Sequence, residues 1–125
     1  MTSISLGKTT PILRSFDEAK AREFYLDFLG FTVVFEHRFE PSLPLYMGIV
    51  RGDCRLHLSE HHGDACPGAN MRIEVQDIDA LQAELAAKAY PHARPSVNTM
   101  PWGTRDMTVA DPFGNRLTFT TAISV

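Results

Sequence analysis

A pattern of elements that occurs twice constrains the fold of this 125-residue chain most strongly. In each half, a short strand-like run precedes an amphipathic helix, and further strand-like runs follow it. The two helix starts, at Asp17 and Asp77, are 60 residues apart in the numbering. This repeat predicts two equal βαβββ modules in one α+β domain that spans residues 1–125.

The first module is expected over residues 8–60. Ser15 and Glu18 have the spacing of a capping box, in which each side chain satisfies the other residue's free amide, so a helix is predicted to start there. Apolar residues at helical spacing then lead to Gly30, which supplies a left-handed stop. These apolar residues are Ala21, Phe24, Tyr25, Phe28 and Leu29. Strands are expected over residues 9–14, 31–38, 45–51 and 54–59.

The second module is expected over residues 70–121, after a linker over residues 60–69. Asp77 is the predicted N-cap of its helix, and Pro91 follows the helix end. One face of this helix is expected to carry Ile78, Leu81, Leu85 and Ala89. Strands are expected over residues 71–75, 96–100, 104–110 and 116–121, with a turn over residues 111–115 before the last one.

Charge and cysteine content exclude several classes of function. The net charge is −3, and Lys and Arg are scattered among Asp and Glu, so no basic stripe for nucleic acid is present. Two cysteines do not make a disulfide framework, and no basic and apolar leader opens the chain. The apolar runs are far shorter than the roughly 20 residues that a membrane span needs. We therefore expect a cytoplasmic protein that binds neither nucleic acid nor membrane.

Four short motifs resemble those of the glyoxalase and bleomycin resistance superfamily, also called the vicinal oxygen chelate superfamily. They are Thr10-Pro11-Ile12-Leu13, Leu29-Gly30-Phe31, Pro101-Trp102-Gly103 and Asp111-Pro112-Phe113-Gly114-Asn115. The Pro-Trp-Gly motif is more typical of the bleomycin resistance branch. The resemblance implies curved mixed sheets that form an open cleft, and a homodimer in which each ligand site is shared. It also implies that the chain crosses at Pro11, so that residues 1–10 dock on the partner.

Metal-dependent members of the superfamily have His, Glu or Gln ligands at four strand positions. Alignment by the motifs puts Thr10, His57, Asn70 and Thr118 at these positions. Only His57 is a good ligand for a divalent cation, and hydroxyls and an amide do not replace the missing donors. We therefore predict no metal site and no cofactor.

The segment from Glu60 to Cys66 is an alternative metal-binding candidate, because it concentrates His, Asp, Glu and Cys residues. It follows a strand and contains Gly63, and Pro67 comes directly after it, which is typical of a surface loop. We favour a polar loop at the cleft mouth or dimer edge.

Binding residues are easier to propose than catalytic ones. Trp102 is the only tryptophan, and Gly103 lets the chain turn beside it, so its indole is predicted to stack on a planar ligand. The alternative is that Trp102 is a core residue. We expect Phe35 and Phe39 to form the wall of the cleft opposite Trp102, and His57 to line the cleft. Acidic residues that are expected to face a cationic ligand are Glu36, Glu60 and Asp106.

Two functions stay open at this point. One is metal-independent binding and sequestration of a planar, cationic small molecule, as the resemblance to bleomycin resistance proteins implies. The other is catalysis by a divalent metal, as a glyoxalase-type lyase or a ring-cleaving dioxygenase. The chain has no nucleophile elbow and no Gly-rich phosphate loop, and Cys54 is expected to be a small buried residue. We favour the binding protein.

Overall fold

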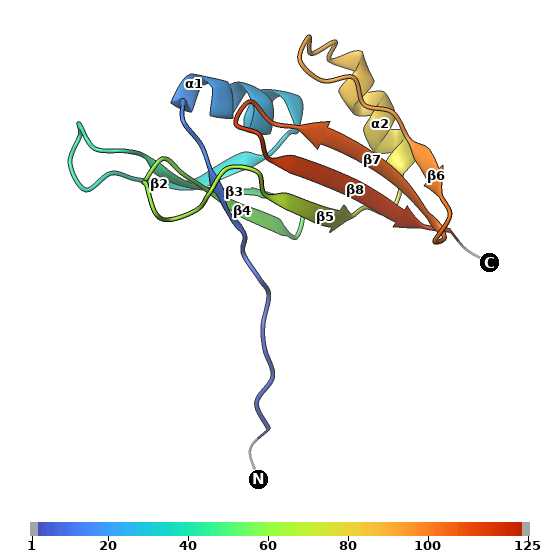
Figure 1. The fold of residues 1–125 in the computed structure, drawn as a ribbon, viewed down its shortest axis with the longest axis horizontal. Coiled ribbons are helices and arrows are strands. Elements are labelled where there is room, and N and C mark those ends of the chain that lie inside the picture. Colours follow the sequence, from blue (N-terminus) through green and yellow to red (C-terminus); the bar gives the residue numbers. More distant parts are fainter. Residues whose placement is uncertain (1–2, 124–125) are drawn as a thin grey trace.

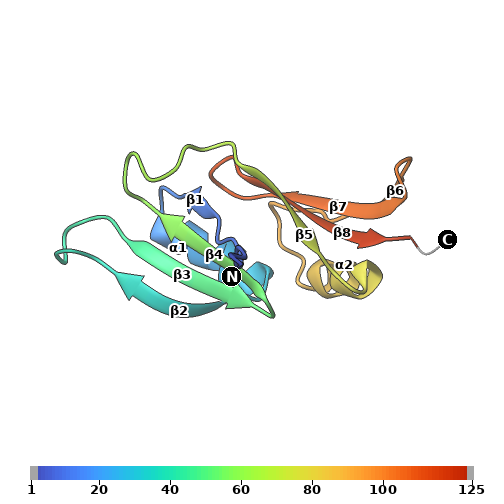
Figure 2. The ribbon, with the colours of Figure 1, turned by 90° about the horizontal axis from the view of Figure 1, so that it is seen from below.

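The computed structural model describes residues 3–123 and has the predicted order of elements in both modules. The two modules lie side by side (Figure 2). The first contains β1 (Ile12–Arg14), α1 (Glu18–Ala21) with its π-helical continuation η1 (Arg22–Phe28), β2 (Thr32–His37), β3 (Tyr46–Arg51) and β4 (Cys54–Ser59). The second contains β5 (Asn70–Glu74), α2 (Ile78–Ala87), β6 (Asn98–Met100), β7 (Thr104–Ala110) and β8 (Arg116–Ala122).

Each module forms one four-stranded mixed sheet. The strand order is β1-β4-β3-β2 in the first sheet, which we call sheet A, and β5-β8-β7-β6 in the second, sheet B. The first strand of each module pairs in parallel with the last, so Ile12 lies opposite His57 and Asn70 lies opposite Arg116. The remaining pairs are antiparallel. The predicted α+β class and the two-module architecture are confirmed.

The first helix starts two residues later than the capping-box prediction. Asp17 is its N-cap, and the Asp17 carboxylate accepts a hydrogen bond from the backbone N–H of Lys20 at 2.9 Å. Ser15 is instead buried, and its backbone N–H donates to the Ser59 carbonyl at 2.9 Å. Ser15 thus prolongs the pairing of β1 with β4, so its N–H is not free to donate to Glu18 as the predicted capping box requires.

Three further boundaries differ from the sequence-based prediction by two residues or more. Helix α2 ends at Ala87, and Ala89 lies beyond it with a φ of 50°, so Ala89 does not belong to the helix face. Strand β1 begins at Ile12 and β6 at Asn98, later than predicted, and the first registered residue pairs are Ile12 with His57 and Asn98 with Asp106. The Asp77 cap is confirmed by a hydrogen bond from the Ala80 N–H at 3.0 Å.

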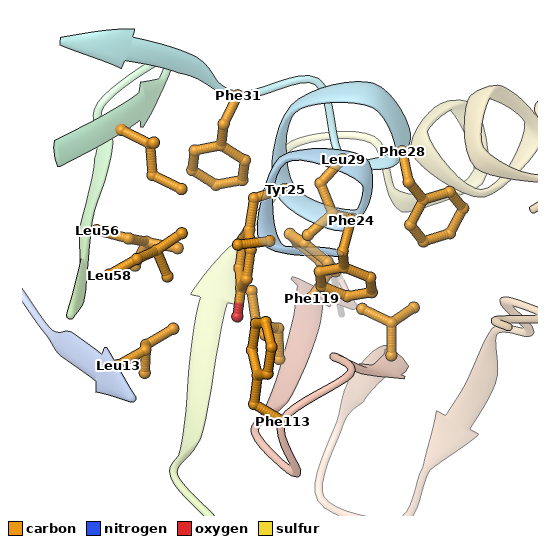
Figure 3. Packing of buried hydrophobic residues seen from close by; sticks show 14 of the residues in the cluster. Leu13, Phe24, Tyr25, Phe28, Leu29, Phe31, Leu56, Leu58, Phe113 and Phe119 are labelled. Carbon is orange, nitrogen blue, oxygen red and sulfur yellow. The ribbon is translucent and has the colours of Figure 1, made fainter. Parts of the chain in front are cut away.

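One cluster of buried side chains draws on both modules (Figure 3). Tyr25 of η1 lies among Leu13, Leu58 and Phe113, and its hydroxyl donates to the Asp111 carboxylate at 2.6 Å. The modules are also joined at the surface, where Arg51 forms a two-bond ion pair with Glu84. Shared burial and these bonds fix one module against the other.

Residues 3–10 form an extended arm that leaves the body on the side opposite the helices (Figure 1). Its Ile4 and Leu6 side chains are 91% and 94% exposed. Residues 1 and 2, which the predicted arm includes, lie outside the described part of the chain. Between residues 3 and 123, no helix is both long and apolar enough to cross a membrane.

Candidate functional site

A hollow of about 530 Å³ lies on the face of sheet B that points away from the core. Strand alternation explains its composition, because every second side chain of β5, β7 and β8 faces the core and the others face the hollow. The volume lies within the range of small-molecule sites, roughly 300–1,000 Å³. The lining residues are Asn70, Arg72, Ser96, Asn98, Met100, Trp102, Asp106, Thr108, Arg116 and Thr118.

Trp102 lies at the rim of this hollow, in the turn between β6 and β7. Gly103 has a φ of 95°, which favours glycine, and its N–H closes the turn onto the Met100 carbonyl at 3.1 Å. The Trp102 side chain is left 61% exposed. The alternative that Trp102 is a core residue is therefore wrong, and the indole is free to stack on a ligand.

Asp106 is the acidic residue of the hollow, and its side chain is 8% exposed. The Arg72 guanidinium donates to both carboxylate oxygens of Asp106, at 3.1 and 3.2 Å, and Thr120 donates to one of them at 2.7 Å. Burial alone would raise the pKa of Asp106, but the hydrogen bonds from Thr120 and Arg72 hold it below its usual value. Asp106 is therefore ionised at neutral pH.

A second candidate surface, the aromatic platform, lies on the open face of sheet A and consists of Phe35, Tyr46 and His57. The Phe35 ring stacks on Tyr46 at 6.1 Å between centroids and meets His57 edge-on at 5.2 Å. Gly48 makes this position possible, because a Cβ there would lie 2.3 Å from the Phe35 ring. A register shift between Val33 and Phe35 turns the ring toward Gly48.

His57 and Tyr46 share a hydrogen bond of 2.7 Å between Nδ1 and the phenol oxygen. Burial raises the pKa of Tyr46, and the Asp64 carboxylate raises it further, so the phenol keeps its proton at neutral pH. When the phenol donates to Nδ1, the imidazole's own proton lies on Nε2. His57 then offers an N–H donor from the platform.

The other predicted residues lie away from the Trp102 hollow. Phe39 is exposed in the loop after β2, where its ring meets His37 and His61 edge-on. The Glu60 carboxylate accepts a hydrogen bond from the Leu45 N–H at 3.1 Å. Glu36 forms an ion pair with Arg22. Both acidic groups are thus engaged within the first module.

The four superfamily metal positions do not present a suitable set of donors. His57 could ligate through Nε2, since only its Nδ1 is bonded to Tyr46, but the Thr118 hydroxyl is paired with the Thr108 hydroxyl at 2.8 Å. Asn70 and Thr10 offer an amide and a hydroxyl, which do not complete the site for a divalent cation. The superfamily metal therefore does not fit these residues.

The Glu60–Cys66 segment is a surface loop, as predicted. Asp64 accepts a hydrogen bond from the Ser59 hydroxyl at 2.6 Å, and the His61 carbonyl accepts one from Arg14 at 2.7 Å. These bonds attach the loop to sheet A. Within residues 3–123, no three His, Cys, Asp or Glu side chains are grouped so that they could hold a metal ion.

A larger groove of about 600 Å³ runs between the modules, but none of the predicted site residues lines it. Its lining mixes core residues, such as Leu29 and Phe119, with polar ones, and it includes the Arg51–Glu84 ion pair. We therefore place the candidate site at the Trp102 hollow and the aromatic platform.

The structure brings Trp102 and Asp106 together in one hollow and Phe35 and His57 together on one platform. It does not bring these two pairs together, because the lining of the hollow comes from the second module alone. Sequence reasoning missed Arg72, Tyr46 and Gly48. Strand alternation placed Arg72 on the same face as Asn70, and this signal could have identified it.

These observations define a protein of two paired βαβββ modules with a ligand-sized hollow on an open sheet face. A protein-family model with the description "glyoxalase superfamily protein" matches residues 1–124. The chain belongs to the glyoxalase superfamily.

Its relatives include proteins that bind bleomycin. Bleomycin resistance proteins of Geobacillus stearothermophilus and Staphylococcus aureus are 29% identical over 130 residues, which cover 90% of this chain and 94% of theirs. The bleomycin-binding protein of the bleomycin producer Streptomyces verticillus, solved with copper(II)-bleomycin, is 33% identical with a TM-score of 0.72. The match covers 98% of this chain and 100% of that chain. The bleomycin resistance determinant of transposon Tn5 is 20% identical, with a TM-score of 0.71, and the match covers 94% of this chain and 98% of that chain. At this identity the likeness shows the shared fold alone.

Proposed function

We propose that this protein binds and sequesters a planar, cationic small molecule of the bleomycin class, without chemistry and without a metal of its own. The observation that carries the proposal is the exposed Trp102 indole at the rim of a ligand-sized hollow. A planar ring stacked on Trp102 gains on the order of 1 kcal/mol beyond area burial, and a cationic ring gains more.

The relatives support the same ligand class. A protein that is 33% identical over nearly the whole chain was solved with copper(II)-bleomycin, and the curated relatives are named as bleomycin resistance proteins. The absence of a fitting donor set at the superfamily metal positions makes the metal-dependent lyase or dioxygenase the weaker alternative.

We further propose that the complete site forms in a homodimer. The aromatic platform and the Trp102 hollow lie on different sheets of one chain, so a ligand clamped by both surfaces needs sheet A of one protomer and sheet B of its partner. The extended arm supports this arrangement, because Ile4 and Leu6 are exposed on their own chain and would be buried on a partner.

The two cysteines are free, which agrees with a cytoplasmic setting.

Calorimetric titration with bleomycin, with and without copper(II), tests the proposal. We expect one molecule bound per chain, with affinity unchanged after the protein has been treated with a chelator. A metal analysis of the purified protein separates the two functions. Stoichiometric zinc, nickel, manganese or iron, with loss of function on chelation, would overturn the binding-protein proposal in favour of the enzyme.

A further inference from the structure

Asp106 and Arg72 form an ion pair inside the Trp102 hollow, and the geometry of this pair bears on ligand selection. The Asp106 side chain is almost wholly buried, whereas the Arg72 side chain is 50% exposed. Arg72 comes from β5, which is an edge strand of sheet B. The carboxylate is therefore a fixed part of the sheet face, and the guanidinium approaches it from the solvent side.

Arg72 also lines a second, adjoining hollow on the same sheet face, together with Glu74, Thr104 and Thr120. Its side chain is thus part of the wall between the two hollows. An arginine side chain has several rotatable bonds, so leaving Asp106 requires rotation of a half-exposed side chain and loss of its hydrogen bond to the Thr120 hydroxyl at 3.1 Å.

We propose that Arg72 is a specificity-determining residue whose guanidinium occupies the place of the ligand's cationic group on Asp106. A guanidinium is itself a planar cation, and it engages both oxygens of the carboxylate. A ligand cation competes with it for these oxygens. This inference rests on the proposed binding of a planar cation at Trp102.

The position of Arg72 on Asp106 has a consequence for which cations bind in the hollow. Arg72 is tethered beside Asp106 at a high effective concentration, so a small cation without further contacts cannot displace it. A ligand that also stacks on Trp102 gains the additional free energy that displacement requires. Arg72 therefore lowers the affinity of every cation by a similar factor, so that only cations that also stack on Trp102 still bind measurably.

Arg116 provides a matched control. It lines the same hollow and carries the same charge, but it forms no ion pair with any residue between 3 and 123. Removing its charge changes the net charge of the hollow without releasing Asp106. A difference between the R72Q and R116Q variants therefore reports on the Asp106 contact rather than on overall charge.

The experiment compares wild type, R72Q and R116Q in titrations with benzamidine, a planar aromatic cation, and with benzamide, its neutral counterpart. Trp102 fluorescence gives the dissociation constants. We expect benzamidine to bind R72Q at least about tenfold more tightly than wild type, one factor of ten being about 1.4 kcal/mol. R116Q removes a charge from the same hollow and leaves the Asp106 contact in place, so it measures the effect of overall charge, and the gain for R72Q is expected to exceed the change for R116Q at least about threefold. Benzamide affinity is expected to stay the same in all three proteins, and adding D106N to R72Q should abolish the gain.

Equal effects of R72Q and R116Q on benzamidine, or weaker binding to R72Q than to wild type, would overturn the inference. Thermal melts establish that each variant is folded. If R72Q does not fold, R72K replaces it, because lysine keeps the charge but loses the two-oxygen contact, and an affinity between that of wild type and a tenfold gain is then expected. An R72K affinity equal to wild type would count against the inference. Bleomycin is not used here, so failure of the proposed function and failure of this inference are distinguishable.

Discussion

At the scale of single residues, the position of Phe35 on the aromatic platform depends on Gly48. Any side chain at position 48 would meet the Phe35 ring, since a Cβ would lie 2.3–2.9 Å from three of its atoms. Because the ring is partly exposed, it can tilt away, but the stacking on Tyr46 is then lost. We predict that Gly48→Ala costs about 1–3 kcal/mol of folding free energy, as overpacking does.

A double-mutant cycle in urea unfolding checks this prediction. In a Phe35→Ala background the ring is absent, so Gly48→Ala should cost much less than in the parent protein. The same cost in both backgrounds would show that Gly48 is needed for a backbone reason and not to accommodate Phe35.

Trp102 gives the sharpest contrast between binding and stability. Because its side chain is 61% exposed, Trp102→Ala is expected to change the free energy of unfolding by less than about 1 kcal/mol. The same substitution should weaken ligand binding by about 2 kcal/mol or more, as loss of an aromatic anchor does. Thermal melts and calorimetry measure the two effects, and the reverse ranking would contradict the assigned role.

At the scale of elements, the sequence predicted the type and order of the helices and strands better than the residues at which they begin and end. Hydrophobic periodicity located both helices and all strands because burial of one face determines which residues are apolar. Which of two nearby residues caps a helix depends on whether either of them is already bonded to another element. Ser15 is bonded into the β1–β4 pairing, which leaves Asp17 to cap.

The end of α2 offers a test of this local physics. Ala89 has a left-handed φ of 50°, which is unfavourable for residues with a Cβ and favourable for glycine. Ala89→Gly is therefore expected to raise the free energy of unfolding by about 0.5–1 kcal/mol.

A glycine substitution inside the same helix is the control. Ala83→Gly should lower the free energy of unfolding by about 1 kcal/mol, because glycine is unfavourable in a helix interior. If both substitutions destabilise the protein equally in chemical unfolding, the left-handed conformation of Ala89 does not govern its contribution.

The candidate site was only partly predictable, for reasons that also belong to the element scale. Trp102 was predicted because it is the only tryptophan and lies in a Pro-Trp-Gly turn that resembles that of the bleomycin resistance branch. Arg72 and Asp106 are 34 residues apart in the sequence and pair only because their strands lie in the same sheet. Gly48 lies opposite Phe35 only because the register between β2 and β3 shifts before Phe35. Pairings of this kind depend on sheet register, which periodicity alone does not reveal.

At the scale of the whole molecule, the extended arm predicts association. The two large apolar side chains, Ile4 and Leu6, are expected to become buried on a partner chain, each contributing roughly 1.5–3 kcal/mol. Replacing both by serine should raise the dimer dissociation constant at least about tenfold. The melting of the monomer should not change, because neither side chain packs on its own module.

Analytical ultracentrifugation over a range of concentrations measures this dissociation constant. Lys8→Ser is the control, since it alters the same arm without removing an apolar side chain. A parent protein that is monomeric at micromolar concentration, or a serine variant that dimerises as well as the parent, would show that the arm does not hold two chains together.

The central claim, that the Trp102 face binds a planar ligand, is tested most directly by the fluorescence of this single tryptophan during a titration with bleomycin. If the indole stacks on the ligand, its emission should change saturably and reach a plateau at one molecule of bleomycin per chain. Emission that stays constant while calorimetry records binding would place the ligand elsewhere on the protein. Constant emission with no heat of binding would contradict the claim for this ligand altogether.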